Sequence, residues 1–515
     1  MVVSVVALTA LVSQNLFART FGGTGDDGAY SLCFTADSGL AIAGYTTSSG
    51  AGGSDLLVIK ASSLGVLQWA RTFGGVGDDW ASSIIETSDS GLAITGYTTS
   101  SGAGGSDLLV IKASSLGVLQ WARTFGGVGD DRAYSIVGTP DGGLAIAGYT
   151  TSFGTGGTDF LVIKLSSSGS LDWAATFGGS EYDWASCLTR TYDGGLAVAG
   201  YTASFGDGGA DFLVIKLSSS GTLDWAKTFG GVDDEWAYSI AETPGGDLAL
   251  AGYTSSFSVG PADALVFMIS SLGDLQWARA VGGGASDYAC QVAVCPDGGL
   301  VFAGYTSSFG AGWGDILAFK MNSSGNLLWA RTFGGTDDDQ PSSVTLTPGG
   351  GIALAGRTVS FGAGSWDCVL LEMDTSGNYP DCVYGCAPTV TTPFLFTTLP
   401  TGLANCTPTG GSPGPSTASP GLTVTDACPP AVEEREPVPG TGITCSPVPG
   451  GALFISPAEL SLRIYSAEGR LAYSGELVKG ENRIILETGA YFWMAGSAGA
   501  GPCVCPPCKG KVIIR

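Results

Sequence analysis

The segment Trp69–Ile84 reads WARTFGGVGDDWASSI, and Trp121–Ile136, 52 residues further along, reads WARTFGGVGDDRAYSI. Phe17 takes the equivalent position one period before the first of six tryptophans that recur at this spacing: Trp69, Trp121, Trp173, Trp225, Trp277 and Trp329. Seven repeats therefore run from about residue 17 to residue 381. A fixed period of this length is typical of a repeat architecture rather than of an ordinary domain.

Each repeat predicts four short strands. In the third repeat these are AYSIVGT, LAIAGYT, DFLVIKL and LDWAATF, separated by the turn PDGG, a glycine loop and the turn SSSG. The two middle strands are apolar on both faces, as buried strands are. Four antiparallel strands per period of about fifty residues are typical of a propeller blade. The sequence thus predicts an all-β fold, a seven-bladed β-propeller over residues 14–381.

The two ends of the repeat array complement each other. The seventh repeat lacks its fourth strand, because NYPDC stands where LQWA is expected, and Asn15–Phe21 is a fourth strand with no blade before it. We expect this N-terminal strand to pair with the third strand near Cys368–Met373 and to close the ring without a free edge.

Composition argues against several classes of function. The chain has 515 residues, a net charge of −24 and no histidine. Nucleic acids and anionic membranes need basic patches, so we expect neither as a partner. The missing histidine removes the commonest general base, Ser–His and Cys–His nucleophile pairs, and His-ligated metal sites. No base is placed beside the abundant Ser and Thr residues, and no glycine loop is followed by G-K-[ST], so we expect no catalytic residues and no organic cofactor.

Two rings of acidic residues recur through the repeats. One aspartate precedes every third strand: Asp55, Asp107, Asp159, Asp211, Asp263, Asp315 and Asp367. A residue that every blade carries is most simply structural, and we expect it to accept hydrogen bonds from loop N–H groups. The second ring precedes the first strand: Asp27, Asp79, Asp131, Asp183, Glu235, Asp287 and Asp339. These carboxylates either cap their loops or, near the mouth of the channel, bind a cation, for which calcium suits the oxygen donors.

The position after the inner acid changes from blade to blade: Gly28, Trp80, Arg132, Trp184, Trp236, Tyr288 and Gln340. The large side chains Trp80, Arg132, Trp184, Trp236 and Tyr288 are our candidates for ligand binding, because aromatic rings stack on sugars and anchor protein partners. The alternative is that they pack between blades.

The remaining segments predict export. Residues 1–13 have the apolar core of a signal peptide without its positive n-region, and no segment predicts a membrane-spanning helix. Residues 382–450 form a Pro/Thr/Ser/Gly-rich linker, and residues 451–515 predict a small β-sandwich. Eight of the 13 cysteines follow residue 381, which favours disulfides outside the cytoplasm, whereas the five in the repeats are expected to be buried apolar side chains.

Three resemblances extend these predictions. The stretch LVIKASSLGVLQW resembles the Trp motif of quinone-dependent dehydrogenase propellers, in which the Trp docks between neighbouring blades. The full WA-x-TFGG…GYT…VIK repeat resembles repeats of secreted bacterial and archaeal surface proteins. The C-terminal region resembles the sorting domain of type IX secretion substrates, on motifs that include Gly489, Tyr491, Gly510 and Lys511. That resemblance implies export across an outer membrane by the secretion machinery that reads this domain, although MAGSAGAGPCVCPPC replaces the plain hairpin of the family.

Together these features predict a secreted or cell-surface propeller, monomeric, that binds glycans or surface proteins without catalysis. Two alternatives stay open at this point. One is an extracellular carbohydrate-processing enzyme that uses carboxylates of the inner acidic ring. The other is a purely structural envelope protein.

Overall fold

The structure is a computed structural model, which describes residues 18–310, 312–361 and 365–378 with their side chains and the backbone of ten further strands. In this part of the chain no helix is long and apolar enough to cross a membrane. The signal peptide predicted for residues 1–13 and most of the linker predicted for residues 382–450 lie outside the described residues.

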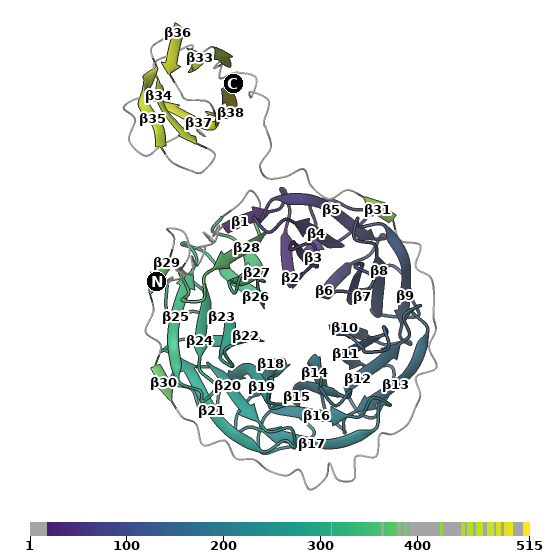
Figure 1. Cartoon of the computed structure of the whole chain (residues 1–515). Helices are drawn as coiled ribbons and strands as arrows, with labels where there is room; N and C mark the ends of the chain where they lie inside the picture. The colour runs from purple at the N-terminus through teal and green to yellow at the C-terminus, as the bar shows by residue number, and fades with distance from the viewer. Residues whose placement is uncertain are drawn as a thin grey trace, which may run out of the picture. The chain divides into compact units, whose positions relative to one another are not determined.

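Seven antiparallel sheets form a ring of blades, with the first strand of each blade nearest the centre (Figure 1). Blades one and two contain β2 (Asp27–Phe34), β3 (Leu40–Thr46), β4 (Asp55–Ala61), β5 (Leu67–Gly74), β6 (Asp79–Glu86), β7 (Leu92–Thr98), β8 (Asp107–Ala113) and β9 (Leu119–Phe125). Blades three and four contain β10 (Asp131–Gly138), β11 (Leu144–Thr150), β12 (Asp159–Leu165), β13 (Leu171–Phe177), β14 (Asp183–Arg190), β15 (Leu196–Thr202), β16 (Asp211–Leu217) and β17 (Leu223–Phe229). Blades five and six contain β18 (Glu235–Glu242), β19 (Leu248–Thr254), β20 (Asp263–Ile269), β21 (Leu275–Gly282), β22 (Asp287–Val294), β23 (Leu300–Thr306), β24 (Asp315–Met321) and β25 (Leu327–Phe333).

Blade seven is built from both ends of the array. It contains β26 (Asp339–Leu346), β27 (Ile352–Thr358), β28 (Asp367–Met373) and, as its fourth strand, β1 (Ala18–Phe21). The register pairs Ala18 with Leu371 and Phe21 with Cys368. The predicted seven-bladed propeller and its closure by the N-terminal strand are therefore confirmed.

Apolar clusters between neighbouring blades form the core. Val58 and Phe73 of blade one, for example, pack with Ile84, Ile94 and Leu109 of blade two. The second and third strands are buried along nearly their whole length, which explains why their sequences are apolar on both faces. Of the five cysteines in the repeats, Cys187, Cys295 and Cys368 are buried as predicted, and Cys33 and Cys290 are only partly buried.

A bulge in the first strand links adjacent blades. The register shifts between Ala29 and Ser31 in β2 and at the same place in the other six first strands. The N–H after the bulge is then donated to the preceding blade: Ile84 N–H bonds to Ser31 Oγ at 3.2 Å, and Val292 N–H bonds to Ser239 Oγ at 3.2 Å. Leu32 N–H bonds to Ser343 Oγ at 3.1 Å, so the same link joins blade seven to blade one.

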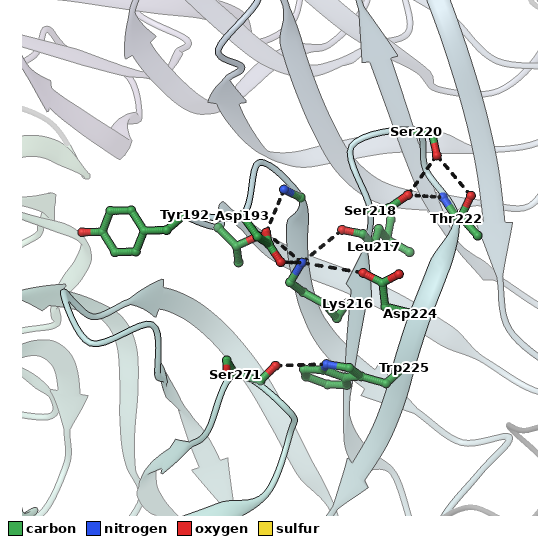
Figure 2. A network of polar contacts seen from close by, with 12 residues as sticks. Tyr192, Asp193, Lys216, Leu217, Ser218, Ser220, Thr222, Asp224, Trp225 and Ser271 are labelled. Atoms are coloured by element: carbon green, nitrogen blue, oxygen red, sulfur yellow. Dashed lines mark hydrogen bonds and ion pairs between the residues drawn. The ribbon is translucent and has the colours of Figure 1, made fainter.

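The repeated tryptophan also joins blades. Trp69 Nε1 donates to the carbonyl of Ser115 at 3.2 Å, and Trp225 Nε1 donates to that of Ser271 at 3.2 Å, each in the next blade (Figure 2). The ring lies over a turn glycine: Gly117 has φ of 75°, and a Cβ there would lie 2.9 Å from the Trp69 ring. This is the docking that the dehydrogenase resemblance implied.

Three tail strands extend outer edges of blades. β29 (Val383–Gly385) pairs with β25, β30 (Thr389–Thr391) with β21, and β31 (Thr423–Thr425) with β5.

The chain divides into two compact units, Met1–Ala431 and Val432–Arg515. In the second unit β32 (Thr444–Val448), β33 (Gly451–Ser456) and β36 (Gly480–Ile485) form one sheet, and β34 (Leu460–Ser466), β35 (Leu471–Leu477), β37 (Gly489–Ser497) and β38 (Cys508–Ile514) form another. The side chains of the predicted sorting motif, including Gly489, Tyr491, Gly510 and Lys511, lie outside the described residues, so the sandwich and its sorting role stay predictions.

Candidate functional site

The two sides of the ring differ in their connections. We call the side with the loops between second and third strands and the connections from each fourth strand to the next blade the loop face (residues 47–54 and 75–78 and their equivalents). The opposite side, with the turns at residues 35–39 and 62–66 and their equivalents, is the turn face. All the ligand-binding candidates lie close to the loop face. Each first strand starts at that face, and the candidates are the second residues of these strands.

Each candidate is one half of a cross-strand pair. The register sets Trp80 opposite Tyr97, and the equivalent residues pair in the other blades. We define the aromatic belt as the two residues at these positions in every blade: Gly28, Tyr45, Trp80, Tyr97, Arg132, Tyr149, Trp184, Tyr201, Trp236, Tyr253, Tyr288, Tyr305, Gln340 and Arg357.

The tryptophans of the aromatic belt are inserted between blades. The Trp80 ring lies 4.2 Å from that of Tyr45 in the preceding blade, with the planes at 4°, and 6.0 Å from that of Tyr97 in its own blade. Trp236 stacks in the same way, 4.3 Å from the Tyr201 ring with the planes at 10°, whereas the Trp184 ring lies 4.0 Å from that of Tyr149 with the planes tilted by 37°. Packing between blades, which the sequence left as the alternative, is therefore confirmed for these residues. Their rings stay half-buried, so part of each is accessible.

The other members continue the stack. The Arg132 guanidinium lies over the Tyr97 ring at 4.1 Å, and its Nε donates to Ser106 Oγ at 2.8 Å. Tyr288 meets Tyr253 edge-on at 5.1 Å. In blade seven, Arg357 donates to Gln340 Oε1 at 2.6 Å, and its guanidinium lies over the Trp366 ring at 4.4 Å. Each of the five candidates thus contacts the belt tyrosine of the preceding blade.

Three tyrosines near the belt were missed by the sequence analysis. Tyr30, Tyr134 and Tyr238 take the fourth position of the first strand in blades one, three and five. Tyr30 stacks on both Tyr45 and Trp80, with ring centroids 5.8 Å apart in each case. Burial raises the pKa of Tyr30 well above its usual range, so its hydroxyl stays neutral. Their recurrence at one repeat position was the signal that could have found them.

The inner acidic residues cap the loops of their own blades. Asp79 Oδ2 accepts hydrogen bonds from Gly75 N–H at 2.8 Å and Ser100 Oγ at 2.6 Å, and Glu235 accepts from Thr254 Oγ1 at 2.7 Å. All seven carboxylates are fully buried: Asp27, Asp79, Asp131, Asp183, Glu235, Asp287 and Asp339. Within the described residues no three Cys, Asp or Glu side chains gather closely enough to hold a metal ion. The loop-capping alternative is confirmed, and calcium binding by this ring stays an untested prediction.

The outer aspartates hold the loops before their strands. Ala51 N–H donates to Asp55 at 3.0 Å, Ala103 N–H to Asp107 at 2.9 Å, and the equivalent bonds recur at Asp159 and Asp263. Their predicted structural role is confirmed. Carboxylate oxygens of both acidic rings therefore accept hydrogen bonds that stabilise the loops of the loop face.

Exposed apolar side chains stand on the loop face. Val76, Val128 and Trp313 are 86%, 89% and 81% exposed. Trp313 was not singled out from the sequence, although it stands where four blades have glycine: Gly53, Gly105, Gly157 and Gly209. A break in an otherwise constant position was the signal available.

The two faces also differ in charge. On the turn face each buried lysine at the end of a third strand pairs with an aspartate of the first turn, for example Lys112 with Asp89 at 2.9 Å. Figure 2 shows this arrangement in blade four, where Lys216 Nζ lies 2.8 Å from Asp193 and 3.8 Å from Asp224. No Lys or Arg occurs in the connections of the loop face, which carry acids such as Asp26, Asp78 and Asp234. The loop face therefore has a negative potential that no basic loop residue offsets.

The carboxylates accept hydrogen bonds within their own loops, and what the loop face presents to a partner is apolar surface, aromatic edges and negative charge. Such a set can hold a neutral or positively charged partner.

Comparisons with known proteins agree with the fold. A family model described as a β-propeller domain of unknown function, DUF5122, matches residues 139–172, which run from the turn after β10 to the start of β13 within the third blade. A search of curated proteins found no match.

Solved structures with similarity include PorZ, described as an essential surface component of the type IX secretion system of Porphyromonas gingivalis (13% identity, TM-score 0.41, 96% of this chain and 60% of that one). Others are a putative gluconolactonase (14% identity, TM-score 0.33, 57% of this chain and 88% of that one) and Sqt1 from Chaetomium thermophilum (12% identity, TM-score 0.38, 66% and 82%). The chain thus spans less than two thirds of the length of PorZ. At this level of identity the likeness concerns the fold alone.

Proposed function

We propose that the protein is a non-catalytic binding or adhesion module, displayed at the outer cell surface, whose loop face holds a glycan or a surface protein. The observation that carries the proposal is Trp313, an 81% exposed indole on a face that also bears exposed valines. Exposed aromatic side chains are the usual anchors of protein partners and of sugar rings.

The aromatic belt reaches the loop that carries Trp313, because a Cβ atom on the adjacent Gly314 would lie 2.0 Å from the Tyr305 hydroxyl. Its rings are stacked against one another, so their accessible parts are held in place and lose little freedom on binding. The negative potential of the loop face favours neutral or cationic partners and disfavours anionic polysaccharides.

The binding experiment uses the full chain, titrated with neutral, cationic and anionic polysaccharides with and without calcium. We expect saturable binding in the first two classes. Trp313→Ala should weaken that binding about tenfold, because removal of a central aromatic anchor commonly costs more than 1 kcal/mol. Leu116→Ala is the matched control, since Leu116 is 69% exposed on the turn face. Equal weakening by both variants would exclude the loop face, and no binding to any polysaccharide would exclude the glycan form of the proposal.

We further propose that residues 451–515 deliver the protein through a type IX secretion machinery, as their resemblance to sorting domains implies. The test is expression in a bacterium that has this machinery, with surface exposure read by protease accessibility of intact cells. The full chain should be cleaved, and a chain that ends at residue 450 should stay protected. Equal exposure of both chains would contradict the sorting role.

A further inference from the structure

Every junction between blades brings together one outer and one inner acid. The first glycine of each F-G-G sequence, and of V-G-G at residues 281–283, lies between the outer aspartate of one blade and the inner acid of the next. A Cβ atom on Gly126 would lie 2.1 Å from Asp107 Oδ1 and 2.9 Å from Asp131 Oδ2. On Gly282 it would lie 2.3 Å from Asp263 Oδ1 and 2.8 Å from Asp287 Oδ2. The two carboxyl groups of a junction are thus near neighbours, and we call them an acid pair.

The acid pairs are buried, and several of their oxygens have no hydrogen-bond partner. Asp107 is 1% exposed and Asp263 is 1% exposed. The unpartnered atom is Oδ1 in both, the oxygen that lies beside the junction glycine and faces the inner acid of the next blade. The other oxygen of each accepts the loop N–H described above. A buried, unpartnered carboxylate oxygen is costly, and it is satisfied if it carries a proton to donate.

The charged groups that face these pairs are almost all acidic. Asp107 is faced by Asp131 and Asp130, and Asp211 by Glu235, Asp207 and Asp234. In the second junction Arg132 lies near Asp130, and its guanidinium is already engaged by Ser106 and the Tyr97 ring.

The fifth blade adds a tyrosine beside its junction, because Tyr253 lies close enough to Glu235 for the carboxylate to act on its titration. A neutral hydroxyl offers no countercharge. These junctions therefore hold two like charges away from water with no cation between them, an arrangement in which one group takes up a proton.

We propose that the acid pairs of Asp107, Asp159 and Asp211 each hold one proton at mildly acidic pH, carried by the outer aspartate, and that release of this proton to solvent as the pH rises loosens these junctions and the loop face. The pKa values agree in direction and range. Burial, with a contribution from the neighbouring inner acid, raises the pKa of Asp107 and of Asp159 to about 6 and that of Asp211 to about 7.

The sign of the effect follows from the raised pKa. An unfolded aspartate titrates near about 3.9, so between that pH and the folded value the native state binds more protons than the unfolded one. The stabilisation is fully present below about pH 4 and is lost as the pH rises through about 6 to 7. Because the acid pairs hold the loops of the loop face, the stability of this binding surface is expected to depend on pH.

The test is the thermal unfolding midpoint of the full chain between about pH 5 and about pH 8. The variant carries Asp107→Asn, Asp159→Asn and Asp211→Asn, because an amide has the shape of a protonated carboxyl group and cannot ionise. The wild-type midpoint should fall as the pH rises, and that of the triple variant should fall less and exceed the wild type at the upper pH. Asp89→Asn, on the turn face, should keep the wild-type slope in this range.

A direct readout covers the case in which the triple variant fails to fold. Infrared spectra of the wild-type protein should show a protonated carboxyl band at the lower pH that disappears at the upper one. Its absence, or equal slopes for wild type and triple variant, would overturn the proposal. So would a calcium-dependent rise of the wild-type midpoint that the triple variant lacks, since the pairs would then bind a cation instead of a proton.

Discussion

Gly74 stands at a point where no side chain fits. A Cβ atom there would lie 2.0 Å from Asp55 Oδ1 and 2.9 Å from Asp79 Oδ2, so Gly74→Ala forces two buried loops apart. We expect a loss of about 1–3 kcal/mol in the free energy of unfolding, as overpacking commonly causes. Chemical denaturation measures it.

Gly138→Ala is the control for that substitution. The nearest atom to a Cβ on Gly138 is 3.8 Å away, an ordinary contact, and Gly138 ends a strand. This variant should be neutral or slightly stabilising, because alanine has fewer unfolded conformations than glycine. An equal loss in the two variants would show that the carboxylates do not set the cost.

For single residues, comparison of the repeats could show which positions vary and which stay constant, but not which side chains they contact. The variable position at Trp80 was found by comparing repeats, and its ring contacts Tyr45, which is separated from it by a loop, two strands and a turn. Only the angle between blades decides whether such a ring meets a ligand or the next blade. Constant positions such as Asp107 were predictable, because a residue that every blade needs must serve the blade itself.

The turn between the third and fourth strands of blades two to seven contacts the repeated tryptophan of the preceding blade. Trp225 Nε1 donates to the Ser271 carbonyl at 3.2 Å, and its ring lies over Gly273. Trp225→Phe should cost about 1 kcal/mol, the net value of one hydrogen bond, and Trp225→Ala about 2 kcal/mol or more, because the packing is lost as well. Unfolding measured for both variants separates the two contributions; equal losses would assign the whole effect to the hydrogen bond.

The bulged first strand gives a second link that can be removed. Ser239→Ala takes the acceptor from Val292 N–H and leaves a buried donor unpaired, with an expected cost of about 1–3 kcal/mol. The control is Ser220→Ala in an exposed turn, where water replaces the lost partners and the cost should be near zero. A neutral Ser239 variant would mean that the bulge does not depend on this link.

Over the whole molecule, the two faces respond to acid in opposite ways. Hydrogen bonds from Thr87 and Lys112 lower the pKa of Asp89 to about 2, and similar pairs recur around the turn face. A lowered pKa stabilises the fold above the unfolded value of about 3.9, and this stabilisation is lost as the pH falls towards about 2.

With the acid pairs acting in the other direction, the unfolding midpoint should be highest at about pH 4. A pH series of thermal scans locates the maximum. Asp89→Asn should flatten its acid side only. A midpoint that rises steadily up to about pH 8 would contradict the balance of the two groups.

The architecture was predictable because each 52-residue period carries its own strand and turn signals, and seven copies with complementary ends allow one closed arrangement. The exposed face was not predictable. Exposure of Trp313 depends on how neighbouring loops fold over one another, and no local pattern encodes that. The negative charge of the loop face could have been predicted from the sequence by assigning each connection to one side of the ring.

The closing strand has a consequence for the order of folding. β1 is among the first segments of the propeller to be synthesised, and its partner β28 is the last strand of the array. Before β28 is synthesised, β1 has no partner strand, although the six other blades can already form. Ring closure is therefore a late step with a large loop-closure entropy. The half-made ring would expose two strand edges and be prone to mispairing with other chains. A protein with this topology is expected to fold slowly, and to do so only after its whole repeat array is available.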